Sequence, residues 1–179
     1  MEGGMNSTIM LASGNYFDLC DPDNSPINIY DISHALSNLC RFTGHCHQFY
    51  SVAQHSVAVS RIVPPEDAMA GLLHDAVEAV IGDVSKPLKT LLPDYRAIED
   101  RIEASILHRF GVPTPLPESV KHADMVLLRT EQRDLMGAGE HVWVFTSGYK
   151  PLDQKIKPLG PDEAFWEFRK RFHELLPPV

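Results

Sequence analysis

Apolar residues recur at helical spacing along most of this chain, and the periodic segments end at proline or glycine. After Asp31, the predicted cap of a first helix, Ile32, Ala35, Leu36 and Leu39 stand at i, i+3, i+4 and i+7 and give one apolar face. The same spacing indicates helices over about 48–63, 66–81, 94–111, 118–136 and from about 160 onward. The sequence therefore predicts an all-α single domain over residues 31–179, after an irregular segment over 1–30. Residues 137–160 are predicted as loop, with a short strand at 141–145.

Length, charge and cysteine content narrow the class of protein. A chain of 179 residues suits one domain that folds without disulfides or a structural metal. Its net charge of −8 argues against a surface that coats duplex nucleic acid. No run approaches the ~20 apolar residues of a membrane span, and the three cysteines form no C-x-x-C pair. We therefore expect a cytoplasmic protein (in the host cytoplasm if it is viral) that binds neither membranes nor duplexes.

The predicted helix over 66–81 carries residues that can bind metals, one imidazole and two carboxylates, on one side. At 100° per residue, His74, Asp75 and Glu78 share a narrow sector, while apolar residues fill the other side. A solvated face is the ordinary explanation. Such a face usually pairs its carboxylates with Lys or Arg, however, and the chain has neither from Pro64 to Val84.

Two other predicted helices carry a chemically active residue on an apolar face. Asp124 falls on the apolar stripe of the helix over 118–136, where an ion pair with Lys121 or a metal ion would compensate its burial. His55 falls on the apolar face of the helix over 48–63, as a hydrogen-bonded core residue or as a ligand. Two histidines and two aspartates on converging helices favour a divalent-metal site with positions open to water.

These residues resemble the signature of the HD-domain metal-dependent phosphohydrolases. The stretch from His74 to Lys89 is similar to the H-D-A-x-E-x-x-x-G-D-x-x-x-P-x-K motif of the YfbR-type 5′-deoxynucleotidases, and the size resembles that of small phage dATP triphosphohydrolases of the DatZ type. Arg41-Phe42 stands where the former have Arg-Trp, and residues 121–124 resemble their K-x-A-D. The resemblance covers about residues 31–136. Gln54 replaces an acidic residue, and the interval between the two histidines is shorter.

The resemblance implies an HD-domain helical bundle and a set of roles. One divalent ion (Zn, Co or Mn) would be held by His55, His74, Asp75 and Asp124. The nucleotide could carry an additional Mg ion. Glu78 would orient or deprotonate the attacking water, and Asp83 would lie near the catalytic centre or the sugar. Phosphate would meet Arg41, Lys89 and Lys121, with Lys86 added by position. Phe42 would pack on the sugar, and His45 could line the pocket.

The substrate stays open between several chemistries. Four cations are generous for one phosphate, which favours a dNTP, with dATP preferred, hydrolysed to deoxynucleoside and triphosphate. The alternative is a 5′-deoxynucleotidase acting on dNMPs. Another HD phosphodiesterase and a non-catalytic metal-binding module are further alternatives, although Glu78 argues against the module. We also expect a positive pocket on the acidic surface, and a homo-oligomer, because related enzymes assemble and the C-terminal helix is aromatic.

Overall fold

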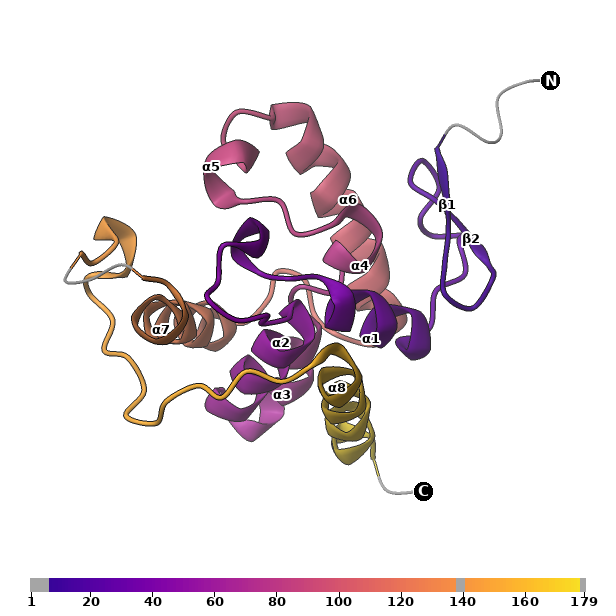
Figure 1. Ribbon diagram of the computed structural model, residues 1–179. Coiled ribbons are helices and arrows are strands. Elements are labelled where there is room, and N and C mark those ends of the chain that lie inside the picture. Colours follow the sequence, from indigo (N-terminus) through magenta and orange to yellow (C-terminus); the bar gives the residue numbers. More distant parts are fainter. Residues whose placement is uncertain (1–6, 138–140, 178–179) are drawn as a thin grey trace.

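The computed structural model describes residues 7–137 and 141–177, and these form a predominantly helical domain (Figure 1). Two short strands precede the helices, β1 Thr8–Met10 and β2 Tyr16–Asp18. The helices are α1 Ile29–Asn38, α2 Val52–Ile62, α3 Ala68–Leu73, α4 Glu78–Ile81, α5 Lys86–Lys89, α6 Pro93–Arg109, α7 Glu118–Leu135 and α8 Pro161–Leu175. Single 3₁₀ turns lie at Phe42–Gly44, Pro65–Asp67 and Val144–Thr146. The mainly helical, single-domain prediction is thereby confirmed.

The segment predicted to be irregular contains an antiparallel hairpin, in which Ile9 pairs with Phe17. Phe17 is fully buried, so the hairpin is part of the core. The predicted cap of α1 is displaced by three residues. Asn28 accepts from the backbone N–H of Asp31, and the Asp31 carboxylate accepts from the N–H of Asn28, which together form a capping box. Asp31 also accepts from Ser13 and so fixes the hairpin to α1. Residues 1–6 of the predicted irregular segment lie outside the described ranges.

Helix α2 lies at the centre of the domain, where it packs against α1, α3, α7 and α8 (Figure 1). Its sequence alternates small and β-branched apolar residues with serine, and Val52, Ala53, Val59 and Ser56 are buried to 0% exposure. A residue on α2 is therefore surrounded by helices from distant parts of the sequence. This central position allows one side chain of α2 to meet groups from both α3 and α7.

The helix predicted over 66–81 is interrupted. Helix α3 ends at Leu73, and residues 74–77 form successive turns before α4 begins at Glu78 and stops at Gly82, whose φ of +80° suits glycine. The N–H of Ala76 donates to the Leu73 carbonyl and that of Glu78 to the Asp75 carbonyl, three residues back in each case. Residues three apart are eclipsed in such a tightened helix. The tightened turn therefore brings Glu78 into line with Asp75, on the side of the helix that the 100° wheel predicted.

The strand predicted at 141–145 is wrong. Residues 141–143 have no regular secondary structure, and a 3₁₀ turn follows at Val144–Thr146. The backbone here bonds to a side chain: Gln132 of α7 donates to the His141 carbonyl and accepts from the Trp143 N–H. In the described part of the chain, no helix is both long and apolar enough to cross a membrane.

Candidate metal centre

Four side chains from α2, the α3–α4 turn and α7 meet at one point. The Nε2 atom of His55 lies 3.3 Å from Nε2 of His74, 3.2 Å from Oδ1 of Asp124 and 3.7 Å from Oδ2 of Asp75. The same Asp75 oxygen lies 3.3 Å from Nε2 of His74. The structure thus brings together the four residues that the sequence analysis chose as metal ligands. Lys121, the alternative partner of Asp124, is exposed at the start of α7.

Both imidazole rings are oriented by hydrogen bonds on their other nitrogen. The Nδ1 atom of His55 lies 2.7 Å from Oε1 of Glu131 and donates to it, and Nδ1 of His74 donates to the Gly71 carbonyl at 2.9 Å. The Nε2 atoms thereby face each other and the aspartates, where they can bind a cation once they are deprotonated. A metal-binding histidine is usually held in this way by a carboxylate or carbonyl. Gly71 also permits close packing, because a Cβ there would lie 3.1 Å from the Ser60 backbone.

Glu131 was not found by the sequence analysis, although the sequence carries a signal for it. It lies seven residues after Asp124, two turns along the same face of α7. It is fully buried, and its second oxygen accepts from Arg41 at 3.1 Å and 3.3 Å. A carboxylate on an apolar stripe that already holds one aspartate is a candidate for orienting a ligand.

The donor set fits a divalent transition-metal ion. Ligand bonds of about 2.1 Å at tetrahedral or octahedral angles place neighbouring donor atoms roughly 3.0–3.4 Å apart. Three of the four measured separations are 3.2–3.3 Å, and the fourth is 3.7 Å. Two imidazole nitrogens and two carboxylate oxygens accept Zn, Co, Mn or Fe. Three of the four, His55, His74 and Asp124, offer atoms that all lie within 4.8 Å of one another.

Without a cation, the cluster is held together by shared protons. Burial and Arg41 lower the pKa of His55, but the carboxylates of Glu131 and Asp124 outweigh them and raise it to about 9. Burial raises the pKa of Asp124, and His55 more than reverses that effect, so the aspartate stays ionised. Burial would also raise the pKa of Asp75, but the neighbouring His74 and Arg41 more than reverse that effect and lower it below its usual value. A metal ion would replace the proton on His55 as the partner of these carboxylates.

Glu78 lies beside this cluster with one oxygen unused. Its Oε2 atom is buried and has no hydrogen-bond partner in the described part of the chain, and Oε1 lies 3.9 Å from Nζ of Lys89. Burial, then repulsion from Asp75 and Asp83, raises the pKa of Glu78 well above its usual value. Burial also raises the pKa of the half-buried Asp83. A buried carboxylate with raised basicity next to a metal cluster suits proton transfer.

Arg41 is buried between two acidic groups. It contacts Glu131, and its Nη1 atom lies 3.5 Å from Oδ2 of Asp75. Its guanidinium also lies over the Phe42 ring, at 5.3 Å from the centroid. The structure therefore places Arg41 at the edge of the metal cluster, while Phe42 is half-buried next to it.

The other predicted cations differ in position. Lys89 reaches the cluster through Glu78 and also pairs with Glu99 at 2.5 Å. Lys86 is exposed, with its Nζ atom 5.4 Å from the centre of the Phe145 ring, and Lys121 and His45 are exposed as well. Arg41 and Lys89 are thus each paired with carboxylates already. The predicted positive pocket does not agree with this arrangement, because acidic groups surround both cations.

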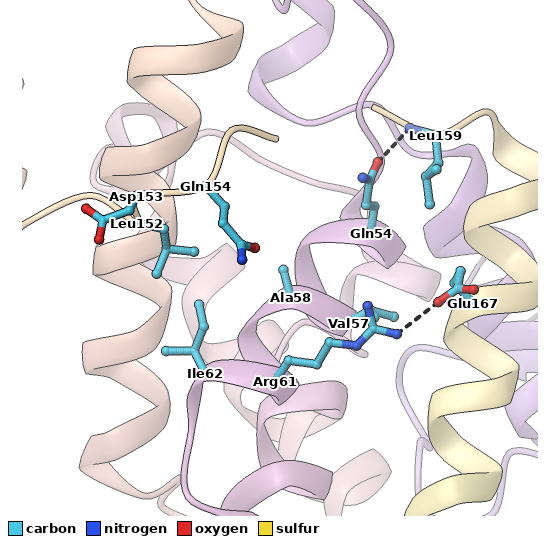
Figure 2. Close-up of a pocket in the computed structure, with 10 residues that line it drawn as sticks. All are labelled: Gln54, Val57, Ala58, Arg61, Ile62, Leu152, Asp153, Gln154, Leu159 and Glu167. Atoms are coloured by element: carbon cyan, nitrogen blue, oxygen red, sulfur yellow. Dashed lines mark hydrogen bonds and ion pairs between the residues drawn. The ribbon is translucent and has the colours of Figure 1, made fainter. Parts of the chain in front are cut away.

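A surface cavity of about 560 Å³ lies on another face of α2, between α2, α8 and residues 152–159 (Figure 2). Gln54 accepts from the Leu159 N–H there and donates to the Lys157 carbonyl. Arg61 crosses the cavity to Glu167 at 2.9 Å. Gln54 therefore points away from the metal cluster and anchors the segment that leads to α8.

Fold and site together define a helical protein with a candidate divalent-metal centre. No family model matches the chain. It is 43% identical over 161 residues, 89% of each chain, to a protein of Escherichia coli (strain K12) named Uncharacterized protein YfdR. It is 35% identical over 185 residues, 93% of this chain and 94% of the other, to Uncharacterized protein RCAP_rcc00048 of Rhodobacter capsulatus. The chain belongs to the family of these two proteins, whose names state no activity.

Proposed function

We propose that this protein is a metal-dependent phosphohydrolase of the HD-domain class that cleaves the phosphate ester at the 5′ position of deoxynucleotides. The observation that carries the proposal is the convergence of His55, His74, Asp75 and Asp124 at 3.2–3.7 Å. Beside them lies the buried Glu78, whose Oε2 atom has no hydrogen-bond partner among the described residues. A binding module would need the ligands but would have no use for a buried carboxylate of raised basicity.

The chain's own residues supply the proton transfers. A divalent ion held by the four ligands supplies Lewis-acid chemistry, which acidifies water and neutralises charge on the phosphoryl group. Glu78 accepts the proton of the attacking water through its free Oε2 atom. Asp83, which follows α4 and is half-buried, donates a proton to the leaving 5′ oxygen. Both carboxylates lie on the α4 side of the cluster.

Phosphate binding falls to Arg41 and Lys89. A guanidinium binds two phosphoryl oxygens at once, and Arg41 offers Nη1 on the side that faces Asp75. Lys86 and Lys121 stand further out on the surface. Two cations at the cluster are fewer than the four on which the preference for a triphosphate rested. The arrangement therefore favours a dNMP over dATP, and the 5′-deoxynucleotidase reaction becomes the first candidate.

The test is a panel of dNTPs, dNMPs and NMPs with Co²⁺, Mn²⁺, Mg²⁺ or Zn²⁺, in which ion chromatography separates orthophosphate from triphosphate. We expect orthophosphate from dNMPs. We expect less from ribonucleotides, because Phe42 would pack against the 2′ side of the sugar and leave little room for a 2′ hydroxyl. Triphosphate released from dATP would restore the substrate first predicted from the sequence. If no mononucleotide is hydrolysed with any metal, the proposal fails. Assembly into a homo-oligomer remains a prediction.

A further inference from the structure

Three consecutive residues of α7 connect the metal cluster to a second surface. Thr130, Glu131 and Gln132 are all buried, at 0–1% exposure. Glu131 holds His55 and Arg41. Its neighbours hold a different segment. Thr130 accepts from the Leu152 N–H at 3.0 Å. Gln132 donates to the His141 carbonyl and accepts from the Trp143 N–H, and its oxygen also accepts from Arg129 on the same helix. One turn of α7 therefore fixes residues 141–152 relative to the metal ligands.

That segment presents a row of aromatic rings, which we call the aromatic row: Phe42, Trp143 and Phe145. The Phe42 and Trp143 centroids are 5.7 Å apart and tilted by 45°, and those of Trp143 and Phe145 are 5.8 Å apart and nearly parallel. Phe145 is 50% exposed. The row begins at the cluster, because Arg41 contacts both Asp75 and the Phe42 ring.

The row is held in place at an energetic cost. Phe42 and Thr43 both have φ of +55°, a region that residues with a side chain rarely adopt. Phe145 keeps half of its surface in water, which an apolar ring would lose if it packed inward. Lys86 lies over Phe145 and Arg41 over Phe42, so each end of the row carries a cation. A row with one exposed ring and a cation at each end suits a ligand in which a planar group is attached to an anion.

We propose that the aromatic row is the base-binding subsite, in which the nucleobase stacks against the outer end of the row, at the exposed Phe145 and the half-buried Trp143, while its phosphate meets the metal cluster. This inference rests on the proposed function and identifies the part of the substrate that residues 141–152 recognise. Stacking accepts any base, because every base has a π face. The subsite therefore selects nucleotides over simple sugar phosphates and discriminates weakly among bases.

Binding is tested apart from hydrolysis. Trp166 is the second of two tryptophans, so Trp166→Phe leaves Trp143 as the fluorescent reporter. Metal-loaded Trp166→Phe protein is titrated with deoxyadenosine, which has no phosphate to lose, and with 2-deoxyribose as the matched ligand without a base. We expect saturable quenching by deoxyadenosine and none by deoxyribose. Unchanged emission up to millimolar deoxyadenosine would overturn the proposal.

Kinetics give the second test. Trp143→Ala and Phe145→Ala should each raise KM for dNMPs about 5- to 150-fold, the effect of one stacked base, and leave kcat/KM for 2-deoxyribose 5-phosphate within about twofold. Trp166→Ala, which removes an exposed ring from α8, is the control and should change neither. Equal losses on both substrates would contradict base stacking. Quenching without hydrolysis would refute the proposed function alone, and hydrolysis insensitive to both row variants would refute the subsite alone.

Discussion

The candidate site has two ends that are built differently. The inner end is the His–Asp cluster with Glu131, and the outer end is the aromatic row with Lys86. At the inner end, His55 and Glu131 are fully buried, and every ring nitrogen and carboxylate of the ligand cluster lies within reach of a partner. At the outer end, Lys86 and Phe145 are exposed and meet each other across 5.4 Å. The comparison shows that the core fixes the His–Asp cluster, whereas the position of the aromatic row depends on surface segments.

Removing a ligand at the inner end should have the largest effect. We expect Asp75→Ala to abolish metal binding and to lower hydrolysis by at least ~10³-fold, equivalent to ~4 kcal/mol of transition-state stabilisation. Metal content after dialysis and initial rates measure the two losses. Asp94→Ala, on the exposed first turn of α6, is the control. A metal-loaded, active Asp75→Ala protein would remove the basis for the inner end.

The metal-free protein should lose stability as the pH rises. The pKa of His55 is about 9 in the folded chain and about 6.5 when unfolded, so the folded state holds an extra proton between these values. That contribution is complete below about pH 6.5 and lost by about pH 9, and it amounts to about 3 kcal/mol. Urea unfolding in the presence of a chelator measures it. A free energy of unfolding that stays constant or increases across this pH range would contradict the proton-linked cluster.

Glu131→Gln tests whether the inner end depends on an orienting carboxylate. The amide keeps the size of Glu131 but no longer draws the His55 proton, so metal affinity should fall about 10- to 100-fold. Saturating metal should restore most of kcat, which a purely structural defect would not allow. Competition with a chelating dye gives the affinity, and Glu174→Gln on the exposed part of α8 serves as the control.

Gln54→Ala separates the two faces of α2. The variant loses the hydrogen bonds to the Lys157 carbonyl and the Leu159 N–H. We expect its free energy of unfolding to be ~1–2 kcal/mol lower. Activity per bound metal should not change, because Gln54 points into the other cavity (Figure 2). A shift in metal affinity would place Gln54 next to the ligands after all.

Lys121→Met should have the smallest effect, within about twofold on kcat/KM, since the side chain is exposed outside the cluster. Lys89→Met is its matched partner and should reduce kcat/KM by more, because Lys89 lies 3.9 Å from Glu78. Equal losses would mean that the outer cations act together, as a triphosphate would require.

The sequence predicted the inner end well because its residues break a pattern. A His or Asp on an apolar helical face stands out, as at His55 and Asp124. His74 and Asp75 stood out instead as a polar sector without Lys or Arg, and together these signals indicated the four residues that converge. Glu131 stands on one of those faces too but was passed over, since only its packing shows what it orients. A helical wheel at fixed pitch placed Glu78 on the side of His74 and Asp75, but it could not show the tightened turn at residues 74–77. The outer end follows from Gln132 holding Trp143, a contact between side chain and backbone that leaves no periodic signal.

The central claim is that four side chains hold one divalent ion beside Glu78. Crystals of the protein soaked in Co²⁺, with data collected at the cobalt absorption edge, test it most directly. We predict an anomalous peak bonded to Nε2 of His55 and His74 and to carboxylate oxygens of Asp75 and Asp124. Cobalt bound elsewhere, or no peak among these four residues at full soak concentration, would contradict the account.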